Sequence, residues 1–434
     1  MGIKGLIGFL SETAPGSLSE CSLESLSGTT VAIDASTALY QFTIAIREGS
    51  YLSSLTNSKG ESTSHITGLL NRCIRLFEFG LKPIFVFDST PPEAKLQTLA
   101  KRKELRQEAE NSLEEAKERD DKEAIRKYVG RTVHISKKEN DSAKQLLRLM
   151  GVPVIEAEEE AEAQCAYLVK QGLADAVGTE DADALVFGCG VLLKNLTASN
   201  KKILKVDLPK VLKLLNLSHE EFTDFCILCG CDYCGTLKGI GPKTAYNLIK
   251  KHKTLARILE VKSETLEGYE VAQEYFKNPK VRHIDEIPRV EVDVQGLKDF
   301  LIVENDFAED RVNKIIDRFV KAKSKKTQLS LKSFFGGASV VAKSGSSGNT
   351  NGDKVQKPSG STVVKNAETQ SVDHKDKADN VVDHQKDSDI QDSSNKYEGD
   401  DHGSATKQDD KPTIGLAAFC PSDIRLVKKR NIGS

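Results

Sequence analysis

"TTVAIDAS", residues 29–36, is the stretch that decides the fold: a short apolar run that ends in an aspartate, Asp34. "LKPIFVFDST" (81–90) repeats the pattern and ends in Asp88. Short apolar runs with turn-forming residues at their ends are typical of parallel strands that are buried on both faces. Two further runs, "VPVIEA" (152–157) and "DAVGT" (175–179), have the same character. We therefore predict four strands of one sheet.

Amphipathic helices separate these runs. "TSHITGLLNRCIRLFEFG" (63–80) and "AEAQCAYLVKQG" (161–172) both end at glycine, a common helix terminator. Repeated strand–helix units predict an α/β fold with a mostly parallel central sheet flanked by helices and joined by right-handed crossovers. Ligands of such sheets bind beyond the carboxyl ends of the strands. Asp34 and Asp88 lie at those ends, so we expect a site there.

The composition divides the chain into a core and a tail. The 434 residues could form two or three average domains, or one large α/β domain followed by a tail. From about residue 336 the sequence is rich in Gly, Ser, Asn, Asp and Lys, which cannot bury enough apolar surface to offset chain entropy. We predict that residues 336–434 are disordered. This tail is almost neutral, so we do not expect it to be a strong basic arm.

The cysteines and the apolar segments indicate where the protein resides. Nine cysteines occur without a disulfide-like framework, and the apolar part of "MGIKGLIGFL" (1–10) is too short and glycine-rich for a secretory leader. We therefore expect reduced thiols and an intracellular protein. No run of about 18 apolar residues is present, so we expect no membrane span.

Acidic residues are expected to gather at the carboxyl edge of the sheet. Seven belong to this set: Asp34, Asp88, Glu160, Glu162, Asp181, Asp183 and Asp232. A helix N-terminus stabilises a carboxylate by only ~0.3–1 kcal/mol, which is too little to balance so many like charges. Divalent cations would balance them, and ligation by carboxylates alone suits Mg²⁺ or Mn²⁺ rather than zinc. Two such ions about 4 Å apart can stabilise the attacking water and the leaving oxygen of a phosphodiester.

Each of these signals alone has an ordinary explanation. An acidic run such as "EAEEEAEAQ" (156–164) is more often a solvated helix face, and a strand-terminal aspartate is often a cap or turn residue. The combination of two strand-end aspartates with two i,i+2 acid pairs beside apolar strands favours a metal site.

A cysteine cluster offers a rival metal site. Cys226, Cys229, Cys231 and Cys234 have a C-x-x-C-x-C-x-x-C spacing that resembles an iron–sulfur or zinc ligand run. However, "EFTDFCILCGCDYCG" (221–235) continues an apolar helical pattern, and no partner Cys or His pair stands nearby. We therefore favour packing in the core, where free cysteine behaves as a small hydrophobe.

Two segments are candidates for binding nucleic acid. "GIGPKTA" (239–245) is a glycine turn that enters a helix, an arrangement that binds phosphate through free N–H groups; an ordinary helix connection is the alternative. Residues 93–138 are highly charged and helical and lack a wide apolar stripe. Lys95, Arg102 and their basic neighbours follow Asp88 and could reach a phosphate at the metals. A solvated surface hairpin is the alternative for this segment.

A short apolar motif precedes the tail. In "TQLSLKSFFG" (327–336), Gln328, Leu331, Phe334 and Phe335 combine an apolar turn with a polar side chain. Two aromatic residues at the border of a disordered segment predict a docking peptide.

Together these stretches resemble the flap endonucleases, the structure-specific 5′ nucleases of eukaryotic DNA replication and repair. The matching stretches occur in family order over about residues 1–335 and include "MGIKGL", "VAIDAS", "YQFTIAIR", "TSH", "KPIFVFD", "PPEAK", "AKR", "EAEAQCA", "TEDADALVFG", "ILCGCDYC" and "GIGPK". As a set they are highly specific.

The resemblance implies a nuclease with two Mg²⁺ ions, which Mn²⁺ can replace, held by the seven acids. It also implies that Lys95 and Arg102 contact the scissile phosphate and stabilise its developing charge. The DNA-binding residues that it implies are Gly2, Tyr40, Arg47, Thr63, Glu160, Asp232, Gly239, Gly241 and Lys243. Within this set, Tyr40 would stack near the cleavage point, and Gly2 would bring the amino terminus to the site after methionine removal.

The resemblance further implies the domain organisation. The nuclease core would be 1–335, with an N-terminal nuclease region (1–107), a helical arch that the 5′ flap passes through (93–138), an internal nuclease region (125–256), and a helix–two-turn–helix that holds duplex DNA with a bound K⁺ (220–256). Residues 328–335, with Gln328, Leu331, Phe334 and Phe335, would bind the sliding clamp PCNA, and 336–434 would be the tail.

The implied role is cleavage of 5′ flaps in Okazaki fragment maturation and long-patch base excision repair, with 5′–3′ exonuclease activity. The partners would be branched DNA with a 5′ flap and PCNA, on whose trimer a monomer would dock. The implied location is the nucleus, both nucleolus and nucleoplasm, with mitochondria as an additional compartment. The sequence departs from the family pattern at Cys229, Cys231 and in the tail, which mixes Lys with many Asp.

Two other functions compete with this interpretation. A catalytically silent DNA-junction protein would not need all seven acids. A sister 5′ exonuclease shares the catalytic acids and "GCDY", but "TSH" and the clamp motif favour the flap enzyme.

Overall fold

The structure is a computed structural model and describes residues 2–47, 55–198 and 201–324; the side chains of 45–47 are not described. The predicted clamp motif (328–335) and tail (336–434) lie outside these residues. No helix in the described ranges has both the length and the apolar character that crossing a bilayer requires.

A seven-stranded sheet forms the centre, with the strand order β1-β7-β6-β5-β2-β3-β4. Strands β2 to β6 are parallel to one another, while β7 pairs antiparallel with both β6 and β1. The strands are β1 (Leu18–Cys21), β2 (Thr30–Asp34), β3 (Lys82–Phe87), β4 (Val154–Glu156), β5 (Ala176–Gly178), β6 (Val191–Lys194) and β7 (Ile203–Asp207). The four predicted strands are confirmed as β2 to β5.

Three strands at the other end of the sheet were missed from the sequence. No residue of β1 and only two residues of β7 are buried, so neither stretch has the continuous apolar run of a parallel strand. These strands form an antiparallel ladder at the edge of the sheet, where one side is left to solvent.

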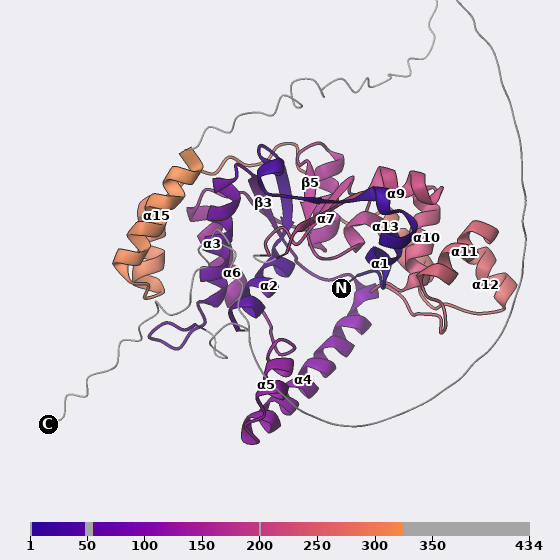
Figure 1. Ribbon diagram of the computed structural model, residues 1–434, viewed down its shortest axis with the longest axis horizontal. Helices are drawn as coiled ribbons and strands as arrows, with labels where there is room; N and C mark the ends of the chain where they lie inside the picture. Colours follow the sequence, from indigo (N-terminus) through magenta and orange to yellow (C-terminus); the bar gives the residue numbers. More distant parts are fainter. Residues whose placement is uncertain (1, 48–54, 199–200, 325–434) are drawn as a thin grey trace, which may run out of the picture. The chain divides into compact units, whose positions relative to one another are not determined.

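Helices cover both faces of the sheet, and alternate strand residues enter two separate cores. Ala32 belongs to the core that contains α1, α7 and α10, whereas Val31 and Ile33 belong to the core that contains α2, α3 and α6. Figure 1 shows these two groups on opposite sides of the sheet. The helices of the first group are α1 (Leu6–Thr13), α7 (Ala161–Lys170), α8 (Asp183–Val186), α9 (Leu208–Leu215), α10 (His219–Cys229), α11 (Pro242–His252), α12 (Leu255–Lys262) and α13 (Tyr269–Lys277). Those of the second are α2 (Ala35–Arg47), α3 (Ser64–Glu78), α6 (Lys137–Leu149), α14 (Val294–Asp299) and α15 (Glu309–Ser324).

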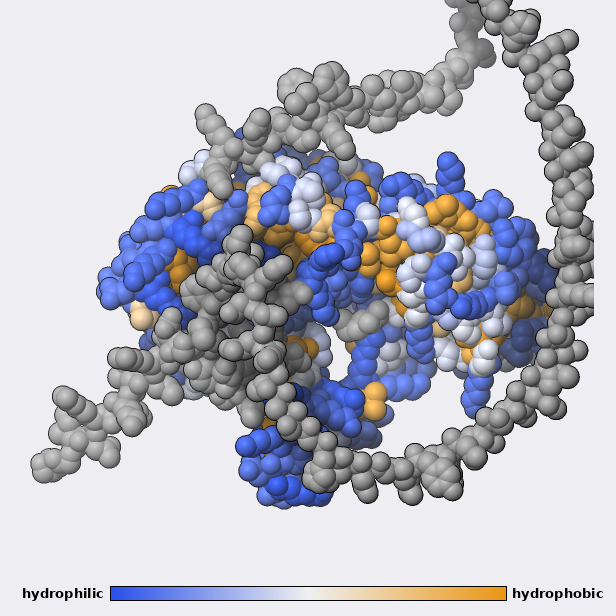
Figure 2. All heavy atoms as spheres, viewed as in Figure 1, coloured by the Kyte–Doolittle hydropathy of each residue, from blue (hydrophilic) through white to orange (hydrophobic). Residues whose placement is uncertain are grey.

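The charged segment predicted at 93–138 forms two helices, α4 (Leu96–Glu118) and α5 (Lys122–Val129), that project away from the sheet (Figure 1). Their only shared core in the described residues is small and consists of Leu113, Ala116, Ile125 and Val129. Most of their surface is hydrophilic (Figure 2). The chain then returns to the body through α6.

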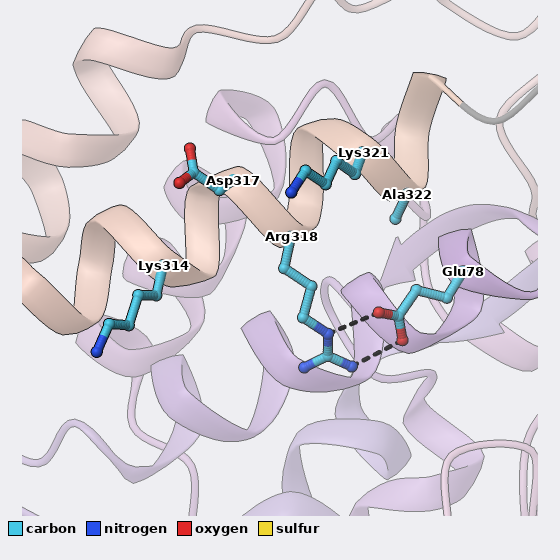
Figure 3. A pocket seen from close by; sticks show the side chains of 6 residues that line it. All are labelled: Glu78, Lys314, Asp317, Arg318, Lys321 and Ala322. Atoms are coloured by element: carbon cyan, nitrogen blue, oxygen red, sulfur yellow. Dashed lines mark hydrogen bonds and ion pairs between the residues drawn. The ribbon is translucent and has the colours of Figure 1, made fainter.

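The last described helix, α15, packs against α3. Arg318 donates two hydrogen bonds to the carboxylate of Glu78, at 2.6 and 2.7 Å (Figure 3). Lys323, one turn further on, donates to the carbonyl oxygens of Met150 and Gly151, both at 2.8 Å. These contacts fix the end of the described chain to the sheet edge that lies opposite the acidic residues.

Candidate active site

Six of the seven predicted acids follow four neighbouring parallel strands. Asp34 ends β2, Asp88 follows β3, Glu160 and Glu162 follow β4, and Asp181 and Asp183 follow β5. Because β3 and β5 lie on opposite sides of β2, the chain reverses direction across the sheet between these strands. Such a switch point leaves a crevice at the carboxyl ends of the strands. The acids therefore come from one edge of the sheet for a topological reason.

Asp34 is the most buried of these acids, with 1% of its surface exposed. One carboxylate oxygen accepts a hydrogen bond from the Thr37 N–H, at 3.1 Å. The other accepts from the hydroxyl groups of Thr37 and of Thr179, the latter at 2.9 Å. Burial, and then the nearby Asp88, raise the pKa of Asp34 to about 7 against these hydrogen bonds. The hydrogen bonds thus fix the orientation of the Asp34 side chain, while its surroundings disfavour the charged form of the carboxyl group.

The N-terminus of α7 holds the second group of acids. Asp88 is exposed and accepts the Ala161 N–H at 2.7 Å, so it satisfies a free donor at the start of this helix. Glu160 is the N-cap residue and Glu162 lies in the first turn, and both are buried. Burial, followed by Asp34, Asp88 and Asp181, raises the pKa of Glu162 well above its ordinary value.

Asp181 and Asp183 lie in the turn between β5 and α8. The Asp181 N–H donates to the Thr179 hydroxyl at 3.1 Å, and the Asp183 N–H donates to Asp181 Oδ1 at 3.0 Å. Asp183 Oδ1 is buried and has no hydrogen-bond partner among the described residues. Burial, and then Asp181 and Asp232, raise the pKa of Asp183 well above its usual range. An unpaired buried carboxylate oxygen is costly unless something else binds it.

Asp232 comes from the loop after α10 rather than from a strand end, and α4 holds it in place. Arg102 donates to both of its carboxylate oxygens, at 2.8 and 2.7 Å. The Thr98 hydroxyl, one turn earlier on α4, donates to the Asp232 carbonyl at 2.8 Å. The base of the projecting helix is therefore joined directly to the acidic site.

Lys95 enters the site from the turn that precedes α4. Its ammonium group forms an ion pair with Glu160 and lies 5.7 Å from the centre of the Tyr233 ring. Burial alone would lower the pKa of Lys95, but Glu162, Glu160 and Asp88 together raise it. Conversely, burial raises the pKa of Glu160 although Lys95 opposes the shift. Lys95 is therefore charged and partly neutralises the acids.

The acids are of the type that binds hard cations, but their side chains do not yet converge on a common point as metal ligands do. Within 2–47, 55–198 and 201–324, no three acidic, histidine or cysteine side chains converge as a metal site. Lys95, Arg102, Thr37 and Thr179 satisfy several of the carboxylate oxygens. The donor set is nevertheless all oxygen, and the buried Asp183 Oδ1 lacks a partner, so the residues fit divalent ions such as Mg²⁺.

The amino terminus lies against this site. Gly2 has a φ of +74°, and a Cβ placed on it would overlap Asp181 Oδ1 and come within 2.7 Å of Asp183 Oδ1. No residue with a side chain fits there. The structure thus brings the predicted Gly2 to the acids.

The other predicted DNA contacts lie around the site. The Tyr40 hydroxyl donates to the Gly130 carbonyl at 3.3 Å, where the chain leaves α5. Thr63 is buried at the start of α3, Arg47 is the last residue of α2, and the side chain of Arg47 is not described. The contacts of Tyr40, Thr63 and Arg47 with DNA stay predictions.

The predicted phosphate-binding turn has the expected geometry. Gly239 has a φ of +77° with open space where a Cβ would be, and Gly241 is the N-cap of α11 without a side chain to occupy the free N–H groups. Lys243 is exposed and pairs with Glu12 at 2.6 Å. The helix N-terminus is therefore open to an anion.

The rival cysteine site is not formed in the described residues. Cys226, Cys229 and Cys231 are buried, and Cys234 is half-buried, but no three of them meet as metal ligands. Cys226 and Cys229 pack in the core with Phe222 and Phe225, as the apolar pattern predicts.

Some residues of the site were missed from the sequence. Thr37, Thr98, Thr179 and Tyr233 each donate a hydrogen bond to Asp34, Asp232 or Glu160. Thr37 and Thr179 stand within three residues of a strand end, which is the signal that could have indicated them. Nothing in the sequence links Thr98 with Asp232.

Comparison with known proteins agrees with this geometry. Residues 1–109 match the XPG N-terminal domain and residues 151–232 match the XPG I-region, and together these segments contain all seven acids, Lys95 and Arg102. Flap endonuclease 1 of Babesia bovis is 78% identical over 336 residues, which are 77% of this chain and 50% of that protein. Flap endonuclease 1 of Theileria parva is 59% identical over 337 residues, which are 77% of this chain and 68% of that protein. The chain thus spans about half of the first relative's length.

Solved structures show the same fold. Flap endonuclease-1 from Methanococcus jannaschii superposes with a TM-score of 0.57 and 37% identity, covering 71% of this chain and 97% of that one. The catalytic core of Rad2 in complex with DNA substrate (complex II) gives a TM-score of 0.54 and 26% identity, covering 73% and 99%.

Proposed function

The chain belongs to the flap endonuclease family, and from that premise we propose that it is a metal-dependent phosphodiesterase that cuts 5′ flaps at their junction with duplex DNA. The family relationship and the DNA substrate of the Rad2 core support this proposal. The observation that carries it is the group of six acids at the ends of four parallel strands, joined by Asp232 from the loop after α10, with Lys95 and Arg102 paired to two of the seven.

The acids would hold two Mg²⁺ ions, which Mn²⁺ could replace. When bound, such ions would lower the pKa of the attacking water and stabilise charge on the phosphodiester. Asp34 would keep its orientation through Thr37 and Thr179, and the unpaired Asp183 Oδ1 would gain a partner. Bound cations would also compete for Glu160 and Asp232, which in this structure are paired with Lys95 and Arg102.

Released from those pairs, Lys95 and Arg102 would face a phosphate at the same place. Both are positioned by α4, so a strand that passes beside α4 would meet them before it reached the acids. Their charges would stabilise the negative charge that develops on the phosphate. Because these groups recognise backbone charge and shape, the enzyme would not read base sequence.

DNA would be held on either side of the acids. The open N-terminus of α11, at Gly239, Gly241 and Lys243, would bind the duplex backbone with a K⁺ ion, and the flap would pass by α4 and α5. Gly2, Tyr40, Arg47 and Thr63 would contribute at the junction. The pathways would be Okazaki fragment maturation and long-patch base excision repair.

The direct test is cleavage of a labelled 5′-flap substrate with Mg²⁺. We expect one flap-length product from the full chain and almost none from Asp181→Asn, while that variant still binds the substrate. Glu158→Gln, an exposed acid two residues from Glu160, is the matched control and should cut normally. Equal cleavage by Asp181→Asn would refute the proposal.

The same assay separates the flap enzyme from the sister exonuclease. Release of single nucleotides from a recessed 5′ end as the main reaction would favour the exonuclease. Binding of the junction without any product, under every divalent ion tried, would favour the silent DNA-junction protein.

A sliding clamp, PCNA, is proposed as the partner of residues 328–335. The motif begins four residues after α15 ends at Ser324, so it would be attached to the body through the Arg318–Glu78 and Lys323 contacts. Phe334→Ala combined with Phe335→Ala should remove stimulation by the clamp and leave basal cleavage unchanged. Loss of basal cleavage would instead place those rings in the nuclease core.

The proposed location follows from this substrate. We expect the protein in the nucleus, in nucleoplasm and nucleolus, and in mitochondria as an additional compartment. A fluorescent fusion of the full chain that stays out of the nucleus would contradict this expectation.

A further inference from the structure

Two cysteines lie in contact beside the acidic site. The sulfur atoms of Cys231 and Cys234 are 3.6 Å apart, in the bend that follows α10. Cys234 also donates to the Gly235 carbonyl at 3.4 Å. A thiol has a single proton, so in that arrangement Cys231 donates to the sulfur of Cys234.

Among the described cysteines, Cys234 and Cys21 are half-buried, whereas the others, including Cys231, are buried. Cys73, Cys165, Cys189 and Cys226 are completely enclosed, and Cys229 is 5% exposed. Cys234 is half-buried and is therefore the more accessible of the two, and the sulfur of Cys231 is in contact with its own. An exposed thiol with a neighbouring resolving thiol is the arrangement of a reversible oxidation site.

The backbone around the pair can adapt to a shorter separation of the two sulfurs. Residues 230–235 belong to no helix or strand and bend at 232–234, and Gly230, with a φ of 108°, lies just before the bend. A disulfide needs the sulfurs at about 2.05 Å, so bond formation must bring the two sulfurs closer together. Asp232 lies between the two cysteines in the chain, so any backbone movement that closes the bond carries Asp232 with it.

We propose that Cys231 and Cys234 are an oxidation site that closes to a disulfide with a hydroperoxide and thereby switches the nuclease off. The loss of cleavage rests on the function proposed above, whereas formation of the disulfide does not. The connection to the site is Asp232, whose carboxylate and carbonyl are bound by Arg102 and Thr98 of α4. Closing the disulfide displaces Asp232, which is one of the carboxylates proposed to hold metal.

The chemistry needs only the two thiols and one hydroperoxide. The sulfur of Cys234, after losing its proton, attacks the outer oxygen of the hydroperoxide; the O–O bond breaks, Cys234 becomes a sulfenic acid, and water or an alcohol leaves. The sulfur of Cys231 then attacks the sulfenic sulfur, the S–S bond forms, and water leaves. In total the two thiols lose two electrons and two protons, which the two oxygen atoms of the hydroperoxide take up as the O–O bond breaks.

Peptide mapping tests the site without any activity measurement. Reduced full-length protein is treated with hydrogen peroxide, its remaining thiols are blocked with N-ethylmaleimide, and it is digested with trypsin. All four clustered cysteines fall in one peptide, 214–238. Because Cys226 and Cys229 are buried, the blocking step is carried out in guanidinium chloride. We expect this peptide to carry N-ethylmaleimide at Cys226 and Cys229, to lack two hydrogens at Cys231 and Cys234, and to give no fragments from within 231–234 until it is reduced. Absence of this species would overturn the proposal.

Cleavage of the flap substrate tests the consequence. We expect oxidised wild type to cut about 10- to 100-fold more slowly, the loss that a misplacement of about 1 Å causes, and dithiothreitol to restore the rate. An oxidised protein that carries the disulfide and cuts normally would overturn the switch.

Variants separate the pair from general oxidation. Cys234→Ser should cut at the normal rate before and after peroxide, because the thiol that remains at this site, that of Cys231, is buried and has no second thiol with which to form a disulfide. Cys21→Ser removes another half-buried thiol and should stay as sensitive as wild type. Equal inhibition of Cys234→Ser and wild type would refute the assignment. If the reduced protein cuts no flap at all, the proposed function fails while the peptide map still decides the disulfide.

Discussion

Arg102 donates two hydrogen bonds to the carboxylate of Asp232, which lies 130 residues further along the chain. This contact joins the base of α4 to the acidic site. The contact therefore connects α4, which would lie beside a flap, with a residue that would hold metal.

Removing Arg102 should therefore affect both catalysis and local structure. We expect Arg102→Ala to reduce single-turnover cleavage by about 10²–10³-fold, because a cation aimed at the developing charge is lost. The loss should appear in the rate at saturating DNA more than in binding. Lys103→Ala removes an exposed neighbouring charge and is the control. A purely weaker binding in Arg102→Ala would contradict this role.

The acidic cluster should lower the stability of the metal-free protein. Asp183→Asn removes a buried carboxylate that has an unpaired oxygen and is repelled by Asp181. In EDTA we therefore expect the free energy of unfolding of this variant to be about 1–3 kcal/mol higher than that of wild type. Its cleavage activity should be lost.

Asp224 provides the matched control for that substitution. It is similarly buried, but it accepts the Leu255 N–H and the Gln273 amide, so Asp224→Asn should destabilise by about 1–3 kcal/mol. Thermal unfolding in EDTA measures both changes: the melting temperature should rise in Asp183→Asn and fall in Asp224→Asn. A loss of stability in both would contradict the account of the cluster.

His65 predicts a distinct dependence of stability on pH. Burial lowers the pKa of His65 to about 4 although Glu139 opposes the shift, whereas the unfolded chain has an ordinary value near 6.5. Between these values the unfolded chain binds more protons, so stability falls as the pH falls. Acidification from about pH 7 to pH 5 should cost wild type about 2 kcal/mol through this residue.

His65→Gln should remove that component. Denaturant unfolding at both pH values would measure it, with the exposed His134→Gln as control. An unchanged difference between pH 7 and pH 5 in His65→Gln would show that another group is responsible.

The pair Arg318–Glu78 should make a small contribution to the attachment of α15. Both side chains are partly exposed, so a double-mutant cycle with Arg318→Ala and Glu78→Ala should give a coupling of about 0.5–1 kcal/mol, less in high salt (Figure 3). A coupling that salt does not change would indicate packing instead of charge.

The strands that position the site were predictable because their signal is local. β2 to β5 are continuous apolar runs, and each is followed by an acid that the parallel topology must bring to the same edge. β1 and β7 were missed because a partly exposed antiparallel ladder needs no such run, and β6 was missed because it is only four residues long and no acid follows it. The acids of "TEDADALVFG" were predictable for the same reason as the strands, since they directly follow one.

The sequence by itself determined the parallel sheet, the acids at its carboxyl edge and the charged helices between them, since periodicity and strand ends act over a few residues. Only the tertiary structure decided which donor each acid meets: Lys95 at Glu160, Thr179 at Asp34, Arg102 at Asp232. It also placed Cys231 against Cys234 beside that last pair. Contacts between distant segments depend on how the helices pack, and no local pattern encodes them.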